Sequence, residues 1–302
     1  MLASVIIPTK NEEANIGRCL EAVYGQSVNF PFEVVVIDSG SRDRTVDVVR
    51  KYPVRLLEIA KLDFHHARTR NLGAAASSGK YLVFLSGDAL PTDNGWLSAL
   101  VRNFEDPAIA AVYGRQLPKA DATPERVFFL QHRYGTTRLV KGTNSNGDGK
   151  HLLYQFSNVN SAIRREVWGS FRFPEDLNAY EDFSFAIQVV RQGFSIVYEP
   201  DAAVFHSHNY TLMRSFQQYF DSGVLYSRRG LWDAQQKNRM RSDGLRYVWS
   251  EIKYLMGHRA GHRIPYVCCY EVARYMGLVL GRNEKLLPFA IKKKASSHRL
   301  FG

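Results

Sequence analysis

Four apolar, strand-like segments of this chain each end in residues that can do chemistry. The segments cover residues 3–8, 33–38, 80–88 and 202–208, and they deliver Thr9, Asp38, Asp88 and the pair His206 and His208. Strands that share a direction in an open α/β sheet end at one edge, and ligands bind outside that edge. Carboxylates and imidazoles gathered there suit a polyanion together with a metal ion. The first hypothesis is therefore an enzyme that uses a nucleotide.

The elements that must position these residues alternate along the first third of the chain. Strand patterns at residues 3–8, 33–38, 54–59, 80–86 and 109–113 are separated by helical patterns. This alternation predicts crossover connections and an α/β fold, with a doubly wound, mostly parallel sheet.

Two helices can be predicted in more detail. The first carries apolar residues at helical spacing from Ile16 to Val23 and ends at Gly25, and another has an apolar face from Trp96 to Phe104 after a cap at Thr92 or Asp93. The members of the two faces are Ile16, Cys19, Leu20 and Val23 for the first helix, and Trp96, Leu97, Leu100, Val101 and Phe104 for the second. Each face is expected to pack against the sheet.

Length and composition are those of a globular protein. The chain has 302 residues, 45% of them hydrophobic and 23% charged, enough for a catalytic domain with a subdomain. The three cysteines, Cys19, Cys268 and Cys269, are odd in number and two are adjacent, which argues against a disulfide framework and predicts a reducing cytoplasm. No signal segment is expected before the first strand. The most apolar stretch, 266–280, contains Glu271 and Arg274, so no membrane-spanning segment is expected.

The positive charge is concentrated near the carboxyl end. Residues 209–302 hold 17 Lys and Arg but 6 Asp and Glu, so the whole net charge of +11 lies there. Such a region suits an anionic membrane surface, and it would attract nucleic acid equally well. No helix-turn-helix, finger or ribonucleoprotein motif is visible, so a nucleic-acid partner is not expected. The oligomeric state cannot be inferred.

We expect two regions. Residues 1–210 form the catalytic domain, with a nucleotide-binding half at 1–115 and an acceptor half at 150–210, and residues 211–302 form a basic amphipathic helical region. The glycine-rich stretch 142–149 is interpreted as a lid or, equally, as a linker. The aromatic and basic residues of the last region suit a membrane interface or a packed helical subdomain. Within it, Lys292–Lys294 is the candidate for lipid contact.

Six ordered segments resemble the family 2 glycosyltransferases, which have the GT-A fold of nucleotide-diphospho-sugar transferases. They are SVIIPTKNEEANI (4–16), EVVVIDSGSRDRT (33–45), TRNLGAAASSGKYLVFLSGDALP (69–91), FSNVNSAIRREVW (156–168), AYEDFSFAIQVVRQG (179–193) and VFHSHNY (204–210). Within that family, FLSGDALP, SNVNSAIRR, HSHNY and the terminal RYMGLVLGRNEKLLP look most like bacterial rhamnosyltransferases. The resemblance implies an inverting, metal-dependent transfer of a sugar, L-rhamnose from dTDP-rhamnose, to a hydroxyl of a lipid-linked or polysaccharide acceptor.

The resemblance also implies a donor site. Asp38 is expected to accept a hydrogen bond from the imide of a pyrimidine base that Pro8 and Thr9 flank, with Glu12 nearby; a turn or cap is the alternative for Asp38, with Asp43 the better cap. Arg70 and Asn71 open a helix after the third strand, where cationic groups and backbone N–H donors suit a phosphate.

Asp88 aligns with the last acid of the family's DxD motif, which holds Mg²⁺ or Mn²⁺ against the donor diphosphate. Ser86 stands where the first acid is expected, followed by Gly87, and this departure is compatible with a deoxynucleotide donor. A plain turn is the alternative for Asp88. His206 and His208, two residues apart in an extended segment, share a face and complete the predicted metal set, with His206 favoured by the family pattern.

The acceptor side rests on two further segments. Asp182 aligns with the family's general base and Glu181 with its acidic neighbour, although two acids in a first helical turn are also explained by the helix dipole. Asn158 and Asn160 fall where the family lines the donor-sugar and acceptor cleft, and an interior strand is the alternative.

Other classes of function stay open at this point. They are a UDP-sugar-dependent glycosyltransferase of the same fold, a nucleotidyltransferase, and a binding protein that keeps the fold without activity. The glycine-rich basic loop that a nucleotidyltransferase carries after its first strand is replaced by Thr9-Lys10-Asn11-Glu12. The expected location is cytoplasmic, with peripheral association at the inner face of the cell membrane through residues 211–302.

Overall fold

The computed structural model describes residues 1–142, 154–176, 178–231, 234–298 and 300–301. These residues form two compact units, Met1–Lys119 with Arg133–Ser207, and Ala120–His132 with His208–Gly302. We call them the sheet unit and the helical unit. Most of the glycine-rich stretch, residues 143–149, lies outside the described residues.

The sheet unit is built on a sheet of nine strands within the described residues, ordered β3-β2-β1-β4-β8-β6-β9-β5, with β7 paired to β9. The strands are β1 (Ala3–Thr9), β2 (Phe32–Asp38), β3 (Arg55–Glu58), β4 (Tyr81–Leu85), β5 (Leu90–Pro91), β6 (Ile109–Leu117), β7 (Leu139–Lys141), β8 (Asn160–Arg164) and β9 (Ser195–Phe205). The first four strands of this order run parallel, as the alternating sequence pattern predicts. The mixed α/β class is therefore confirmed.

The strand β8 changes the direction of the sheet. It pairs antiparallel with β4 on one side and with β6 on the other, while β6 and β9 run parallel. Because β8 runs the opposite way, its first residues lie at the same edge as the last residues of β4 and β6. The start of β8 therefore lies beside the ends of the parallel strands.

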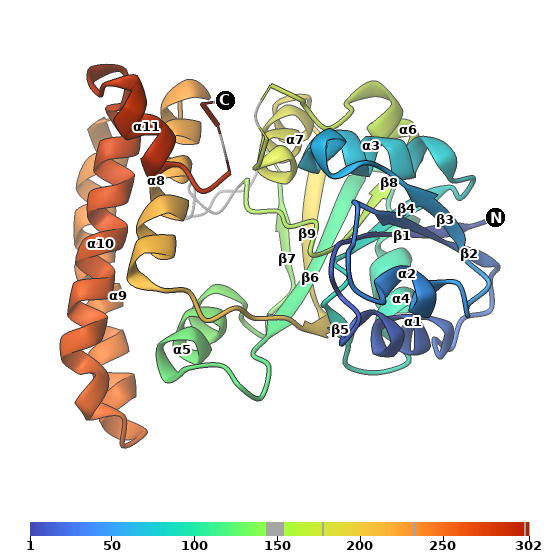
Figure 1. Cartoon of the computed structure of the whole chain (residues 1–302), viewed down its shortest axis with the longest axis horizontal. Helices are drawn as coiled ribbons and strands as arrows, with labels where there is room; N and C mark the ends of the chain where they lie inside the picture. Colours follow the sequence, from blue (N-terminus) through green and yellow to red (C-terminus); the bar gives the residue numbers. More distant parts are fainter. Residues whose placement is uncertain (143–153, 177, 232–233, 299, 302) are drawn as a thin grey trace. The chain divides into compact units, whose positions relative to one another are not determined.

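Helices cover both faces of this sheet. Figure 1 shows α1 (Ile16–Tyr24), α2 (Thr45–Val49) and α4 (Trp96–Val101) on one face, and α3 (His66–Ala76), α6 (Arg165–Ser170) and α7 (Glu181–Arg191) on the other. Short 3₁₀ segments occur at Lys61–Asp63 and Arg102–Glu105. The two covered faces explain why the central strands are apolar along their whole length.

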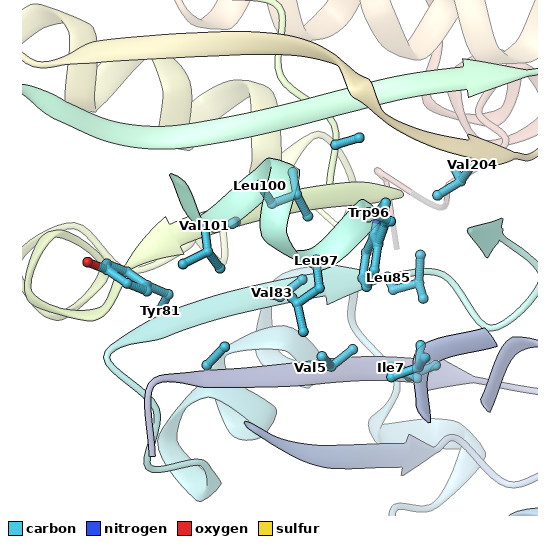
Figure 2. Close-up of a cluster of buried hydrophobic side chains, with 14 of the residues drawn as sticks. Val5, Ile7, Tyr81, Val83, Leu85, Trp96, Leu97, Leu100, Val101 and Val204 are labelled. Atoms are coloured by element: carbon cyan, nitrogen blue, oxygen red, sulfur yellow. The ribbon is translucent and has the colours of Figure 1, made fainter. Parts of the chain in front are cut away.

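The main core lies between the central strands and the helices α1 and α4. Figure 2 shows Trp96 and Leu100 of α4 among Val5 and Ile7 of β1 and Val83 of β4. All of these side chains are fully buried, and each buried aliphatic one contributes about 1.5–3 kcal/mol. The faces predicted for both helices are confirmed as buried.

One detail of the second of these helices differs from the prediction. The helix α4 begins at Trp96 with Gly95 at its N-cap, and the Asp93 carboxylate accepts a hydrogen bond from the Gly95 N–H at 2.8 Å instead of capping the helix. The Asp93 side chain, predicted as a cap, therefore stabilises a tight turn before the helix.

The helical unit contains α8 (Leu212–Arg228), α9 (Ala234–Gly257), α10 (Ile264–Arg282) and α11 (Phe289–Ala295), together with most of α5 (Pro124–Arg133). Further 3₁₀ segments occur at Gly261–Arg263 and Glu284–Leu286. Gly277 and Gly281 lie against the backbone of Phe216 and Phe220, where a Cβ atom would clash, so α8 and α10 pack closely. None of the helices described here is long and apolar enough to cross a membrane.

Candidate active site

The turn after β4 presents Ser86, Gly87 and Asp88 at the carboxyl edge of the sheet. A Cβ atom on Gly87 would lie 2.9 Å from Oγ1 of Thr9, so the glycine lets the ends of β1 and β4 approach each other. In the described part of the chain, the buried Thr9 hydroxyl has no hydrogen-bond partner. A polar group left in this way marks a place where a ligand can bind.

Lys119 and His206 of the sheet unit lie beside the Asp88 carboxylate. Its Oδ2 lies 2.9 Å from Nζ of Lys119, and its Oδ1 lies 3.5 Å from Nε2 of His206. Its side chain is 11% exposed, so the carboxylate is accessible but largely shielded. Lys119 was not predicted from the sequence. It lies two residues beyond the end of β6, which extends past the predicted strand to Leu117.

Gln116 of β6 orients the His206 ring. Nε2 of Gln116 donates hydrogen bonds to the Tyr134 hydroxyl at 2.7 Å and to Oγ of Ser157 at 3.1 Å, so its carbonyl oxygen faces Nδ1 of His206 at 3.0 Å. That oxygen can only accept, so Nδ1 carries the proton. Nε2, the atom that faces Asp88, then has its lone pair available for a metal ion.

The residues at this edge fit a divalent cation. A carboxylate oxygen and an imidazole nitrogen face each other 3.5 Å apart, and the pair is the mixed oxygen and nitrogen donor set that transition-metal ions accept. Mn²⁺ takes both donor types, whereas Mg²⁺ prefers oxygen. His208 is the first residue of the helical unit, so its place in the donor set stays a prediction.

The negative charge of Asp88 helps to raise the pKa of two nearby residues, Glu12 and Cys19. Burial and the Asp88 charge both raise the pKa of Glu12, which accepts a hydrogen bond from Asn15 at 2.7 Å. Burial, followed by the charges of Asp88 and Glu12, raises the pKa of the Cys19 thiol to about 12. Glu12 therefore belongs to the electrostatic surroundings of Asp88, and its contact with a donor stays a prediction.

Asp38 lies at the end of β2 and is 2% exposed. Its Oδ2 accepts from the Ser41 N–H at 2.9 Å and its Oδ1 from the Ser41 hydroxyl at 2.5 Å, which is the turn role that the sequence left open. Asp43 accepts from the N–H of Thr45, the first residue of α2. Thr9 and Asp38 are direct partners in the β1–β2 register, and half-buried Pro8 precedes Thr9. Contact with a base stays a prediction.

Glu181 and Asp182 begin α7, directly after Tyr180, which has φ 62°. A tyrosine in this left-handed region stores backbone strain, which is often found at functional sites. Oδ1 of Asp182 accepts from the Phe183 N–H at 2.7 Å and Oδ2 from the Asn158 N–H at 3.2 Å. The Asp182 carboxylate is thus held by two backbone donors.

The two acids differ in charge state. Burial and the adjacent Glu181 charge raise the pKa of Asp182 to about 7. Burial acts to raise the pKa of Glu181, but the Arg70 guanidinium at 3.0 Å, the charge of His66 and the hydrogen bonds to the carboxylate together lower it. Glu181 is thus the fixed anion, and Asp182 is the acid that can exchange a proton near neutral pH.

Arg70 and Asn71, predicted to contact the donor, lie on α3 and are nearly buried. Arg70 pairs with Glu181. Asn71 donates to the Phe173 carbonyl at 3.0 Å and accepts from the Trp168 indole at 3.1 Å. These bonds give Asn71 a structural role, because its amide is used within the protein, and they do not support the predicted donor contact.

The predicted cleft residues Asn158 and Asn160 have different roles. Asn160 is fully buried; it accepts from the Trp96 indole at 2.8 Å and donates to the Ala202 carbonyl at 2.7 Å. Its amide therefore bonds within the core, which agrees with the interior strand that the sequence left as the alternative to a cleft position. Asn158 donates through Nδ2 to Glu181 at 3.3 Å and, as noted, through its N–H to Asp182.

The segment 157–159, just before β8, contacts three parts of this edge. Ser157 accepts from Gln116, which holds His206, and Asn158 holds both acids of α7. The Val159 carbonyl accepts from the Ser86 N–H at 3.0 Å, in the turn that carries Asp88. The structure therefore brings Asp88, His206 and Asp182 to one edge of the sheet through a single short segment.

Comparison with known proteins finds relatives by sequence. A sequence profile described as glycosyl transferase family 2 matches residues 4–168. The chain is 34% identical to the O-antigen chain rhamnosyltransferase RfbN of Salmonella typhimurium, over 100% of this chain and 96% of that protein. It is 33% identical to the O-antigen chain rhamnosyltransferase WbaN of Salmonella anatum, over 99% and 95%.

Solved structures share the fold. The mannosyltransferase PcManGT from Pyrobaculum calidifontis, in complex with GDP-Man and Mn²⁺, aligns with a TM-score of 0.62 and 19% identity over 94% of this chain and 87% of that chain. TarS 1-349 from S. aureus, in complex with UDP-GlcNAc, aligns with a TM-score of 0.57 and 18% identity over 94% and 91%.

Proposed function

Because the chain belongs to glycosyl transferase family 2, and is thus a transferase, we propose that it moves L-rhamnose from dTDP-rhamnose to a hydroxyl of an O-antigen glycan, with inversion. Both full-length relatives named above are O-antigen rhamnosyltransferases, which supports this sugar and this class of acceptor. The observation that carries the proposal is the meeting of Asp88 with His206 and Lys119 at the edge that also holds Asp182.

Asp182 acts as the general base in this proposal. The acceptor hydroxyl transfers its proton to the Asp182 carboxylate while its oxygen attacks the anomeric carbon from the side opposite the diphosphate. The bond from that carbon to the diphosphate oxygen breaks, and dTDP leaves with the bonding electrons. A base works best when its pKa is near the working pH, and the pKa of about 7 meets this condition. Glu181, held by Arg70, keeps that pKa raised.

In this proposal the residues around Asp88 stabilise the negative charge of the donor diphosphate. Asp88 and His206 would hold a divalent cation, which supplies Lewis-acid stabilisation of the leaving diphosphate when it is bound. Lys119 adds a positive charge 2.9 Å from Asp88. Thr9 offers a buried hydroxyl, and Ser86 in place of an acid suits a deoxyribose, which has one hydroxyl fewer than ribose.

The acceptor in this proposal is lipid-linked and is met at the inner face of the cell membrane. The net charge of +11, all of it in residues 209–302, supports attachment of the helical unit to an anionic surface. The enzyme is then cytoplasmic and peripherally bound, with residues 1–210 as the catalytic region and 211–302 as the attachment region.

A thermal-shift panel tests the donor assignment. The protein is heated with dTDP, UDP, GDP or ADP, each with Mn²⁺, with Mg²⁺ or with a chelator. Binding to the folded state raises Tm, so dTDP with a metal ion is expected to give the largest shift. A larger shift in Tm with UDP would indicate that the donor is a UDP-sugar. Equal shifts with purine and pyrimidine diphosphates would contradict the proposal. Formation of dTDP-rhamnose and inorganic diphosphate from dTTP and rhamnose 1-phosphate, the reaction of a nucleotidyltransferase, would contradict it as well.

A further inference from the structure

The helical unit contains a cleft that the proposed transfer does not use. It lies between the first half of α8 and the chain from α11 to the carboxyl end, and its volume is about 530 Å³. Its lining is Arg214, Gln217, Lys293, Lys294, Ser296, Ser297 and Phe301. A cleft of this size accommodates a phosphate with part of the group that carries it.

The charge of this cleft is entirely positive. Arg214, Lys293 and Lys294 line it, and among the described residues no Asp or Glu does. Within the same part of the chain, none of these three cations forms an ion pair. The neighbouring Lys292 behaves differently, because its Nζ lies 3.5 Å from Glu284 and 5.4 Å from the ring centre of Phe301. Of the predicted lipid-contact run, two lysines therefore face the cleft and one does not.

The walls of the cleft are fixed by buried contacts. Asp221 of α8 is fully buried, and its Oδ2 accepts from the Ser297 N–H at 2.9 Å and from the His298 N–H at 3.0 Å. The Gln217 amide donates to the Lys294 carbonyl at 3.0 Å. The carboxyl-terminal segment is thus tied to α8, so the backbone that carries the lysines needs little further ordering when an anion binds.

Large apolar side chains are exposed next to this cleft. Leu286 is 82% exposed, Phe289 61% and Ile291 51%, and they lie on the 3₁₀ turn and helix that lead into Lys293. Figure 1 shows α11 beside the ends of α8 and α10, within the helical unit. A basic cleft with exposed apolar neighbours suits a bilayer surface, where apolar groups enter the acyl region and cations meet the head groups.

We propose that this cleft binds the phosphate group of an anionic lipid, with Phe289 and Ile291 inserted into the bilayer beside it. Arg214 can offer two N–H groups to phosphate oxygens, and the two lysines add positive charge. The exposed apolar residues favour a lipid over a free phosphate or nucleotide, which would gain nothing from them. This inference gives a location to the membrane attachment in the proposed function, but it needs neither the donor nor the reaction.

Co-sedimentation with vesicles tests the site. The full chain is mixed with vesicles of phosphatidylcholine alone or with phosphatidylglycerol, without donor or acceptor. Lys293→Gln with Lys294→Gln is expected to weaken binding to anionic vesicles about 30-fold, since each cation near an anionic leaflet is worth roughly a factor of five. Arg18→Gln with Lys51→Gln is the matched control, because both side chains are exposed on the sheet unit and the net charge changes equally.

Two more arms separate the sources of phosphate. Phe289→Ser with Ile291→Ser keeps every charge and is expected to weaken vesicle binding at least several-fold, whereas inorganic phosphate at the same phosphate concentration should not release the protein. An equal loss of vesicle binding in the lysine variant and its control would show that the cleft is not the binding site. Full vesicle binding by the lysine variant would show the same. Because no donor is present, this outcome is independent of the nucleotide panel.

Discussion

Asp88 and Asp182 lie at the same edge of the sheet, but their neighbours carry opposite charges. Asp88 faces Lys119 and the His206 imidazole, whereas Asp182 follows Glu181 directly and has a pKa of about 7. Cationic neighbours keep a carboxylate charged, and an anionic neighbour makes it accept a proton more readily. One edge thus offers a carboxylate suited to bind a cation and another suited to move a proton.

The largest effect is expected at the proton-moving end. Asp182→Asn keeps the shape of the side chain and removes the base, so turnover should fall roughly 10²–10⁴-fold while dTDP still raises Tm. Rates of rhamnosyl transfer and nucleotide thermal shifts measure the two properties. The matched control is Asp47→Asn, an exposed acid on α2 of the same unit. Near-normal turnover in Asp182→Asn would show that Asp182 is not the base, and the proposed difference in role between Asp88 and Asp182 would be wrong.

Asp88→Asn tests the cation-binding end. The variant loses the anionic ligand, so the extra Tm rise that Mn²⁺ gives to dTDP should disappear and turnover should fall about 10²–10³-fold. Titration of Mn²⁺ in the presence of dTDP measures the first effect. A metal response equal to that of the unchanged protein would show that Asp88 is not a ligand.

Gln116→Leu also tests the cation-binding site, without changing a predicted ligand. It removes the acceptor that fixes the His206 tautomer, so Mn²⁺ affinity should fall about 10–100-fold, as is usual when a ligand loses its orienting partner. Gln116→Glu keeps an acceptor at this place and should restore most of the affinity. If the two variants bind Mn²⁺ equally, His206 does not depend on Gln116.

The smallest effect is expected from pH. Asp182 must be ionised to act as a base, so kcat/KM should rise about tenfold from pH 6 to 8, with a midpoint near the pKa of about 7. The Asp182 pKa is raised in the folded state, so its contribution to stability is present at low pH and is lost as pH rises through about 7. Asp182→Asn should therefore raise Tm at pH 8. A flat rate profile would contradict this assignment.

Much of this arrangement could be predicted from the sequence. The central strands and the faces of α1 and α4 follow from local apolar patterns. Asp88 was predicted because it ends an apolar strand and matches the family's metal-binding motif, and Asp182 because it matches the family's acidic pair. The place of β8 could not be predicted, because its pairing with β4 and β6 depends on residues far apart in the chain. The segment 157–159 takes its importance from that pairing.

Individual polar side chains were harder to interpret. Asn160 and Asn71 occur in motifs of the family, but their amides are used within the core, and only the three-dimensional contacts show it. Lys119 was missed for the opposite reason. It belongs to no motif that the sequence suggested, and the strand was predicted to end at residue 113, whereas β6 continues to Leu117, two residues before Lys119.

The cysteines have a practical consequence. Cys19 is buried, with a pKa raised to about 12, so its thiolate is scarce at neutral pH and thiol reagents should leave it unmodified. Cys268 and Cys269 are exposed on α10 of the helical unit. A maleimide fluorophore should therefore label the natural sequence on the helical unit alone, and its emission can report contact with a vesicle without any engineered cysteine.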